Sequence, residues 1–198
     1  MSFAHAPLSD QELGPAVLRM VGPDAAKPMR VMAARGLAPL PPRDLVVAIY
    51  QLWVLNEQPL AEEAAKTIES LPTGVLVGAL GDGRMQPGVL DFLGRKLVRK
   101  EDVLERIVRH PNVANETLAG VARLCPESIC NVLAENQQRW LKYPAIVESL
   151  YQNPNCRMSV AHHMLELAVR QGVELKLPNI EEIKLALGDI GKIGRAHV

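Results

Sequence analysis

Three cysteines and two histidines in the second half of the chain are of residue types that bind metal ions. They are Cys125, Cys130, Cys156, His162 and His163. Zinc sites usually pair their ligands closely, as in Cys-x-x-Cys, because one tight turn then directs two thiolates at one ion. Cys125 and Cys130 are more widely spaced and have Pro126 between them, so we expect their thiols to face different directions. We therefore predict no metal site and no cofactor, and buried cysteines that act as small hydrophobic side chains.

The two histidines, His162 and His163, are neighbours on a predicted helix. Adjacent side chains on a helix diverge by about 100°, so this pair cannot bind one ion together. The position favours an exposed pair, and the alternative is a pH-sensitive contact with a partner protein. We include both in a candidate partner-binding set.

A tryptophan flanked by cations supplies the rest of that set. Arg139, Trp140, Lys142 and Tyr143 combine the aromatic and cationic side chains that anchor protein interfaces. The alternative is that Trp140 packs in the core between helices.

One glycine-rich stretch has the composition of a phosphate loop without its context. Gly81-Asp82-Gly83-Arg84 follows no predicted strand, and no Lys-Ser or Lys-Thr comes after it to reach phosphate or magnesium. We predict a turn between helices there. Neither Gly-x-Ser-x-Gly nor His-Glu-x-x-His occurs in the chain, so the motifs predict a protein that is not an enzyme.

The charge balance argues against a nucleic-acid or membrane partner. The 198 residues include 22 Lys plus Arg and 22 Asp plus Glu, so the formal charge is zero. A neutral chain lacks the broad basic field that recruits nucleic acid or anionic lipid. The basic stretch from Arg95 to Arg109 is interrupted by Glu101, Asp102 and Glu105, which indicates a solvated helix face.

The hydropathy pattern favours a cytoplasmic protein with no membrane contact. The most apolar run, 45–55, is about half the length that a membrane span needs, and it is typical of a buried core helix. The first residues lack the basic start and apolar segment of a secretory signal. Three cysteines without an export signal fit thiols that stay reduced.

Helical periodicity fills the chain, with Pro and Gly at the breaks. Ser9 and Glu12 predict a capping box at the start of the first helix. A Pro-rich connector, 37–42, is expected to separate an N-terminal helical pair, 1–36, from a helical repeat array, 43–188.

No stretch shows the sustained alternation of a strand, although 75–77 and 173–177 have the composition of a short one. The helices that we expect from the connector onward span 44–56, 60–71, 72–80, 89–98, 101–109, 115–124, 126–135, a short segment around 140, 145–152, 158–171 and 180–187.

A Pro-Asn pair recurs between these helices. It stands in His110-Pro111-Asn112, Asn153-Pro154-Asn155 and Leu177-Pro178-Asn179. The first two copies are 43 positions apart, and the residues after them match in apolar or small character. A period of about 40–47 is typical of HEAT-like units. We therefore predict an all-α fold, a right-handed superhelix (α-solenoid) of short antiparallel helices, in which Asn112 and Asn155 cap the next helix and set the turn between repeats.

The helix-Pro-Asn-helix pattern from Arg109 to Leu124, with its second copy at 153–155, resembles bacterial leucine-rich-repeat-variant and HEAT-like or ARM-like helical repeats over roughly 87–187. The resemblance implies a superhelical scaffold that binds a protein, and it carries no catalytic residues.

The leading hypothesis is a non-catalytic interaction scaffold that presents a concave or edge surface to a protein partner. One alternative is a HEAT-like protein that binds nucleic acid or repairs DNA bases, with Trp140, Arg139 and Glu135 as its aromatic, cationic and acidic groups. The zero net charge argues against that alternative. Another is the regulatory N-terminal module of a longer protein.

The last residues suggest that the reading frame was cut. Residues 193–198, Ile-Gly-Arg-Ala-His-Val, are what translation of ATC GGA AGA GCA CAC GTC gives, a string that we recognise as a common sequencing adapter. We expect a disordered tail at 189–198 in which 193–198 is a library artefact. Sequencing the gene with different library chemistry and finding the same codons would disprove this.

Overall fold

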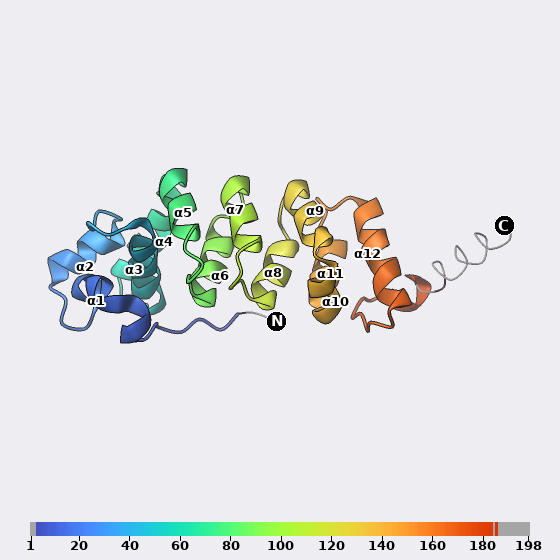
Figure 1. Ribbon diagram of the computed structural model, residues 1–198, viewed down its shortest axis with the longest axis horizontal. Coiled ribbons are helices and arrows are strands. Elements are labelled where there is room, and N and C mark those ends of the chain that lie inside the picture. The colour runs from blue at the N-terminus through green and yellow to red at the C-terminus, as the bar shows by residue number, and fades with distance from the viewer. Residues whose placement is uncertain (1–2, 184, 186–198) are drawn as a thin grey trace. The chain divides into compact units, whose positions relative to one another are not determined.

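The computed structural model describes residues 3–183 and 185, and within them it consists of helices joined by short connections (Figure 1). The helices are α1 (Asp10–Val21), α2 (Lys27–Ala34), α3 (Pro42–Val54), α4 (Leu60–Ser70), α5 (Thr73–Leu80), α6 (Pro87–Lys96), α7 (Glu101–Val108), α8 (Asn115–Ala122), α9 (Glu127–Glu135), α10 (Gln137–Lys142), α11 (Ala145–Tyr151) and α12 (Met158–Arg170). A further helical stretch begins at Ile180. The expected tail, 189–198, lies outside the described residues.

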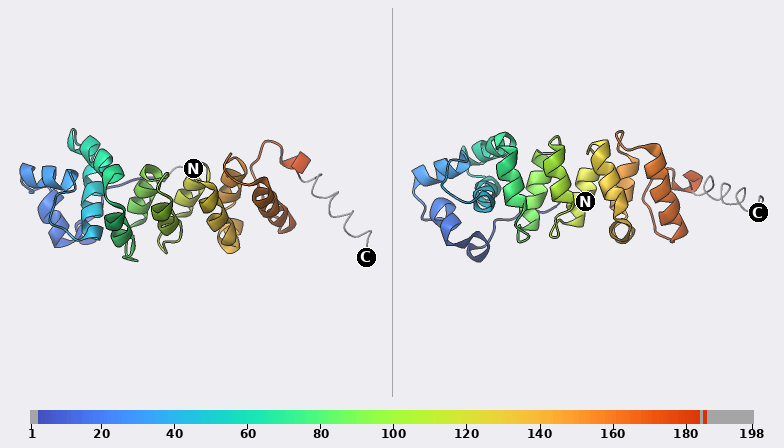
Figure 2. Two further views of the ribbon diagram at one scale, coloured as in Figure 1. Left: turned by 90° about the horizontal axis from the view of Figure 1, so that it is seen from above. Right: turned by 45° about the horizontal axis from the view of Figure 1, so that its top comes forward.

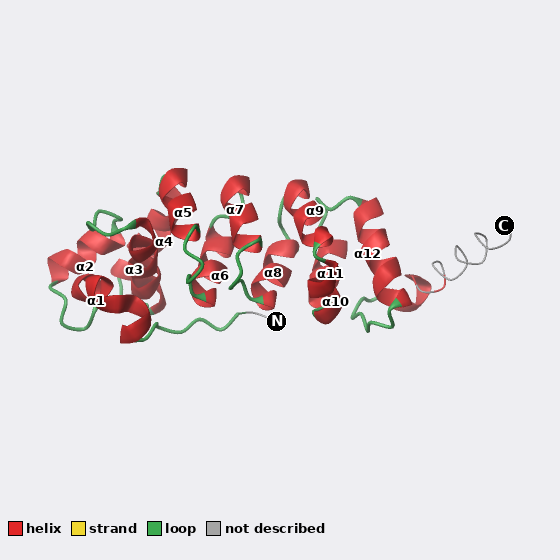
Figure 3. Ribbon diagram, in the orientation of Figure 1, coloured by secondary structure: helices red, strands yellow, loops and turns green. Residues whose placement is uncertain are grey.

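The described residues include no strand, so the predicted all-α class is confirmed (Figure 3). Residues 75–77 lie within α5, and 173–177 form no regular element. No helix in this part of the chain is long and apolar enough to cross a membrane. The right-handed superhelix stays a prediction.

Helices α3 and α6 begin two residues earlier than predicted, and α2, α3 and α6 each have proline in their first turn. Pro28, Pro42 and Pro87 occupy the first or second position of α2, α3 and α6. Proline fits there because the first amides of a helix have no partner within the helix, so its missing N–H removes no bond. The hydropathy pattern predicted that α3 and α6 begin after the proline instead of at it.

The chain divides into two compact units, residues 1–117 and residues 118–198, and the division falls within α8. The predicted connector, 37–42, lies inside the first unit.

The core of the first unit is built around α3, which packs against α1, α2, α4, α5 and α6. All residues from Leu45 to Leu52 are buried, which confirms the buried core helix predicted from this apolar run. A helix that is apolar on every face is stable only where other helices surround it. In Figure 1 and in both views of Figure 2, α5 and α7 lie side by side, and the two helices are in contact.

The start of α1 has the predicted capping box. The backbone N–H and the hydroxyl of Ser9 both donate to the Glu12 carboxylate, at 2.8 and 2.6 Å. These two hydrogen bonds lower the pKa of Glu12. The sequence did not predict the interruption inside α1, where Gly14 has φ 76° and precedes Pro15. Only glycine adopts this backbone conformation without steric strain.

In the second unit, α12 packs against α9 and α11, and α10 packs against α11. Trp140 on α10 is 1% exposed, and its indole N–H donates to the carbonyl of Ala134 at 3.1 Å. The large apolar ring is therefore part of this unit's core.

Candidate partner-binding surfaces

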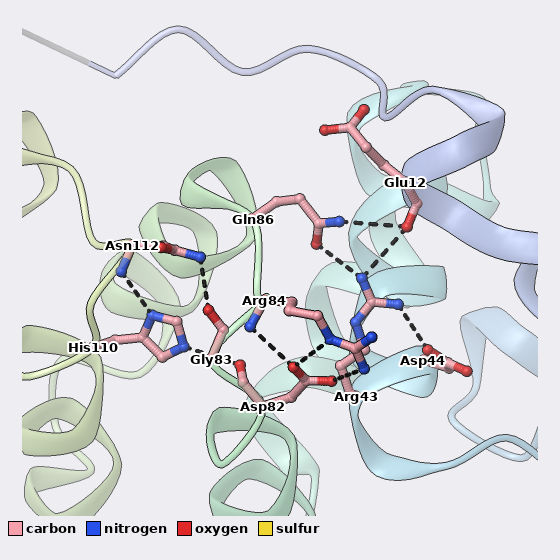
Figure 4. Close-up of polar contacts among 9 residues, drawn as sticks. All are labelled: Glu12, Arg43, Asp44, Asp82, Gly83, Arg84, Gln86, His110 and Asn112. Carbon is pink, nitrogen blue, oxygen red and sulfur yellow. Dashed lines mark hydrogen bonds and ion pairs between the residues drawn. The ribbon is translucent and has the colours of Figure 1, made fainter.

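The first Pro-Asn copy hydrogen-bonds the connection between α7 and α8 to the connection between α5 and α6 (Figure 4). His110 is 4% exposed, and its Nδ1 accepts from the backbone N–H of Asn112 at 3.1 Å, while its Nε2 lies 3.1 Å from the carbonyl oxygen of Asp82. Because Nδ1 accepts, the proton is on Nε2, which donates to Asp82. The Asn112 amide donates to the carbonyls of Gly83 and Met85, at 2.8 and 3.2 Å.

The second copy repeats this arrangement with asparagine in place of histidine. The Oδ1 of Asn153 accepts from the N–H of Asn155 at 2.8 Å, and its Nδ2 donates to the carbonyls of Ala122 and Cys125, at 2.8 and 3.0 Å. The Asn155 amide also donates to Cys125 O, at 3.3 Å. Asn112 and Asn155 thus hold the turn between helices through bonds to the preceding connection. The predicted capping of the next helix is wrong for Asn155, because Arg157 is the N-cap residue of α12 and no side chain caps that helix.

The hydrogen bonds to the preceding connection join residues that lie 27 to 31 positions apart. This spacing is shorter than the 43 positions that separate the first two Pro-Asn copies. The third copy has a contact at a similar spacing but of a different kind, because the Asn179 amide donates to the side-chain hydroxyl of Tyr151, the last residue of α11, at 3.4 Å and 28 positions back.

The connection between α5 and α6, which the first copy contacts, contains the predicted turn at 81–84. The Asp82 carboxylate accepts from the backbone N–H of Arg84 at 2.9 Å and from its guanidinium at 3.1 and 2.9 Å. These bonds lower the pKa of Asp82 to about 2 and raise that of Arg84. Beside this turn, Arg43 and Gln86 both donate to the Glu12 carbonyl, at 3.4 Å (Figure 4). The stretch is a structural turn whose charges are paired with each other.

A hollow of about 600 Å³ opens between α5 and α7 in the first unit. The residues that line it are Thr73, Val77, Leu80, Asp102, Glu105, Arg106, Arg109, His110 and Pro111. Val77, Leu80 and Pro111 are its apolar lining residues. Exposed side chains of both charges stand on α7, and Arg109 donates to Glu105 at 3.0 Å. We call this feature the α5–α7 groove.

The sequence did not predict the α5–α7 groove. The mixed charges of 101–109 predicted a solvated helix face instead. The signal that was present is their spacing. Asp102, Glu105, Arg106 and Arg109 recur at helical intervals and therefore stand on one side of α7. What the sequence could not show is that α5 lies beside that side.

The predicted partner-binding set lies on two helices of the second unit. Arg139, Trp140 and Lys142 are on α10, with Tyr143 directly after it, whereas His162 and His163 are on α12. Both histidines are exposed, as predicted, Lys142 is exposed, and Arg139 and Tyr143 are half-buried.

Trp140 must be removed from that set, because its indole is buried. The aromatic and cationic composition could not show which side of the six-residue helix α10 faces the core. The alternative prediction for Trp140, packing in the core, is confirmed.

The cysteines correct another prediction. All three are buried, as expected, but Cys125 and Cys130 face each other, with their sulfur atoms 3.6 Å apart. The Asn153 amide lies 3.6 and 3.5 Å from these two sulfurs, and the thiol of Cys130 also hydrogen-bonds with that of Cys156. Pro126 does not turn the thiols apart because the chain enters α9 directly after it, which brings Cys130 back over Cys125.

The hydrogen bond with Cys125, and then burial, raise the pKa of Cys130, and burial raises that of Cys156 to about 11. In the described residues, no group of three or more His, Cys, Asp or Glu side chains is arranged to hold a metal ion. The three cysteines form a buried cluster between α9 and the connection before α12.

Comparisons of the chain with protein-family models, with curated proteins and with solved structures gave no match.

Proposed function

We propose that this protein is a non-catalytic interaction scaffold and that the α5–α7 groove holds a segment of its protein partner. The observation that supports the proposal is the combination of apolar and charged lining residues in one hollow of about 600 Å³. Apolar side chains supply affinity when they leave water, and charges at the rim select the partner and its orientation.

The groove fits a segment that carries an apolar side chain for Val77 and Leu80 and charges of both signs for α7. Asp102 and Arg106 are exposed lining residues that lie one helical turn apart, so they would pair with a cation and an anion of the partner. The zero net charge of the chain agrees with a partner recognised by local charge pattern and not by a broad electrostatic field.

A quantitative capture experiment tests the proposal. The purified chain is used to capture proteins from a lysate of its source organism, alongside Val77→Asp and Arg106→Glu. Both variants should capture about ten-fold less, or still less, of the same specific partner. Val77→Asp places a charge among the apolar lining residues, and Arg106→Glu reverses the sign of a charge on α7. Glu62→Lys, at an exposed position of α4, is the matched control that should retain it. A partner captured equally by all four proteins would exclude this groove.

Nothing in the geometry favours the DNA-repair alternative. Its aromatic candidate, Trp140, is buried and hydrogen-bonded to Ala134, so it is not placed to stack on a base. A gel shift with duplex DNA at low salt is the direct test, and we expect no shift.

A further inference from the structure

Residues 3–9, which we call the N-terminal strap, lie as an extended loop over α3 and α6 of the first unit. Figures 1 and 2 show the loop leaving the start of α1 and running past these helices. The strap has no regular secondary structure, and none of its residues is buried. The side chains below it are different, because Tyr50, Asp91 and Phe92 are at most 1% exposed.

His5 is the side chain by which the strap is anchored. Its Nε2 lies 3.0 Å from the carboxylate of Asp91, which also accepts from the hydroxyl of Thr117 at 2.8 Å and pairs with Arg95. The imidazole packs edge-on against Trp53, with ring centroids 4.8 Å apart, and lies beside Tyr50 at 5.9 Å. A buried carboxylate inside a ring of aromatic side chains is a built site for an imidazole.

Two further contacts bind the backbone of the strap and not its side chains. The Gln51 amide accepts from the N–H of Leu8 at 2.9 Å and donates to the carbonyl of the same residue at 3.4 Å. The hydroxyl of Tyr50 donates to the carbonyl of Ala6 at 3.1 Å. Such contacts recognise an extended peptide whatever its side chains at these positions.

Phe3 completes the pattern. Its ring packs against the imidazole of His5, with centroids 5.3 Å apart. Gly88 on α6 leaves room here, since a Cβ at that position would lie 3.5 Å from the Phe3 ring and only 2.6 Å from the Tyr50 hydroxyl oxygen. The side-chain requirements are therefore an aromatic residue followed two positions later by histidine.

We propose that the surface formed by Tyr50, Gln51, Trp53, Asp91 and Phe92 is a binding site for an extended segment of a partner protein with an aromatic-x-His sequence, and that the strap is its intramolecular competitor. The half-exposed strap is held by the side chains of His5 and Phe3 and by three hydrogen bonds to its backbone, so it opens at a lower free energy than the helices beneath it. A partner segment that repeats its contacts replaces it without disturbing the core. This site is separate from the α5–α7 groove, and its test is independent of that proposal.

The test uses the full chain and the fluorescein-labelled peptide Phe-Ala-His-Ala-Pro-Leu-Ser, which copies residues 3–9. The Phe3→Ala/His5→Ala double variant should bind this peptide at least about ten-fold more tightly than the unmodified chain, in which the tethered strap competes at an effective concentration on the order of millimolar. Adding Asp91→Asn should reverse most of the gain. The control peptide Ala-Ala-Ala-Ala-Pro-Leu-Ser should bind none of the proteins.

A second measurement on the unmodified chain covers the case in which the double variant does not fold. Excess peptide should increase hydrogen exchange at the Leu8 amide, because displacement of the strap breaks its bond to Gln51. Equal peptide binding by the double variant and the unmodified chain, or exchange that the peptide leaves unchanged, would overturn the proposal. A concentration-dependent dimer that disappears in the double variant would also overturn it, since the occupant would then be the strap of a second copy.

Discussion

At the scale of single residues, His110 and Asn153 perform the same task with different chemistry. Each accepts from the N–H two positions later and donates to a carbonyl of the preceding connection. An imidazole with its proton on Nε2 offers an acceptor and a donor in the same order as a carboxamide. His110 is therefore a structural residue, although its type and its place beside the α5–α7 groove also suit catalysis.

This equivalence predicts that His110→Asn is tolerated. His110→Ala should lower the free energy of unfolding of the first unit by about 1–3 kcal/mol, because it leaves buried groups without partners. His110→Asn should recover at least half of that loss. Urea denaturation followed by Trp53 fluorescence measures both. An Asn variant as unstable as the Ala variant would show that the imidazole packs in a way that the amide cannot replace.

The thiol cluster predicts slow alkylation of its cysteines and a folded state that loses stability at high pH. Because the pKa of Cys156 is raised to about 11 and that of Cys130 is also raised, iodoacetamide at pH 8 should modify neither thiol until denaturant is added. A raised pKa stabilises the folded state below the ordinary thiol pKa near 9, and that contribution is lost as pH rises through 11.

The check is the urea midpoint of the second unit between pH 8 and 10.5, followed by Trp140 fluorescence. Cys156→Ala should reduce the fall of that midpoint with pH, while tyrosine and lysine titration affects both proteins alike. The same fall in both proteins would contradict the prediction.

At the scale of the elements, local chemistry was enough to predict most helices and their ends. Proline in the first turn, glycine after the last and the capping box at Ser9 each act within a few residues, so the sequence displays them directly. The thiol pair, the α5–α7 groove and the site around Asp91 depend on which helices become neighbours. One sequence contains no signal for that choice, which is why Trp140 was first taken as a surface residue.

The capping box gives the prediction that belongs to this scale. Ser9→Ala and Glu12→Gln should each lower the stability of the first unit by about 0.5–1 kcal/mol, as loss of a helix cap does. The pKa of Glu12 is lowered, so its contribution is complete above the ordinary glutamate pKa and is lost as pH falls through the folded value. Urea midpoints from pH 7 to 3 should therefore converge for Glu12→Gln and the unmodified chain. Parallel curves would show that the carboxylate charge has no part in the cap.

At the scale of the whole molecule, the two units can be observed separately, because the chain has two tryptophans and each unit contains one. Trp53 reports the first unit, and buried Trp140 reports the second.

This separation predicts a local response to Asn153→Ala. The substitution removes buried hydrogen bonds from the connection between α11 and α12, which should cost about 1–3 kcal/mol. The urea midpoint should fall for Trp140 in a Trp53→Phe background and stay nearly constant for Trp53 in a Trp140→Phe background. Equal shifts would mean that the chain unfolds in a single cooperative transition.

The strap also sets an order of events during synthesis. The Asn112 and Asn155 contacts join residues about 30 positions apart, so each forms soon after its second half leaves the ribosome. His5 is synthesised long before its partner Asp91. For that interval a nascent chain exposes an unoccupied histidine-and-phenylalanine tag. A co-translational partner or chaperone that reads such a tag would meet it only while α6 is still unmade.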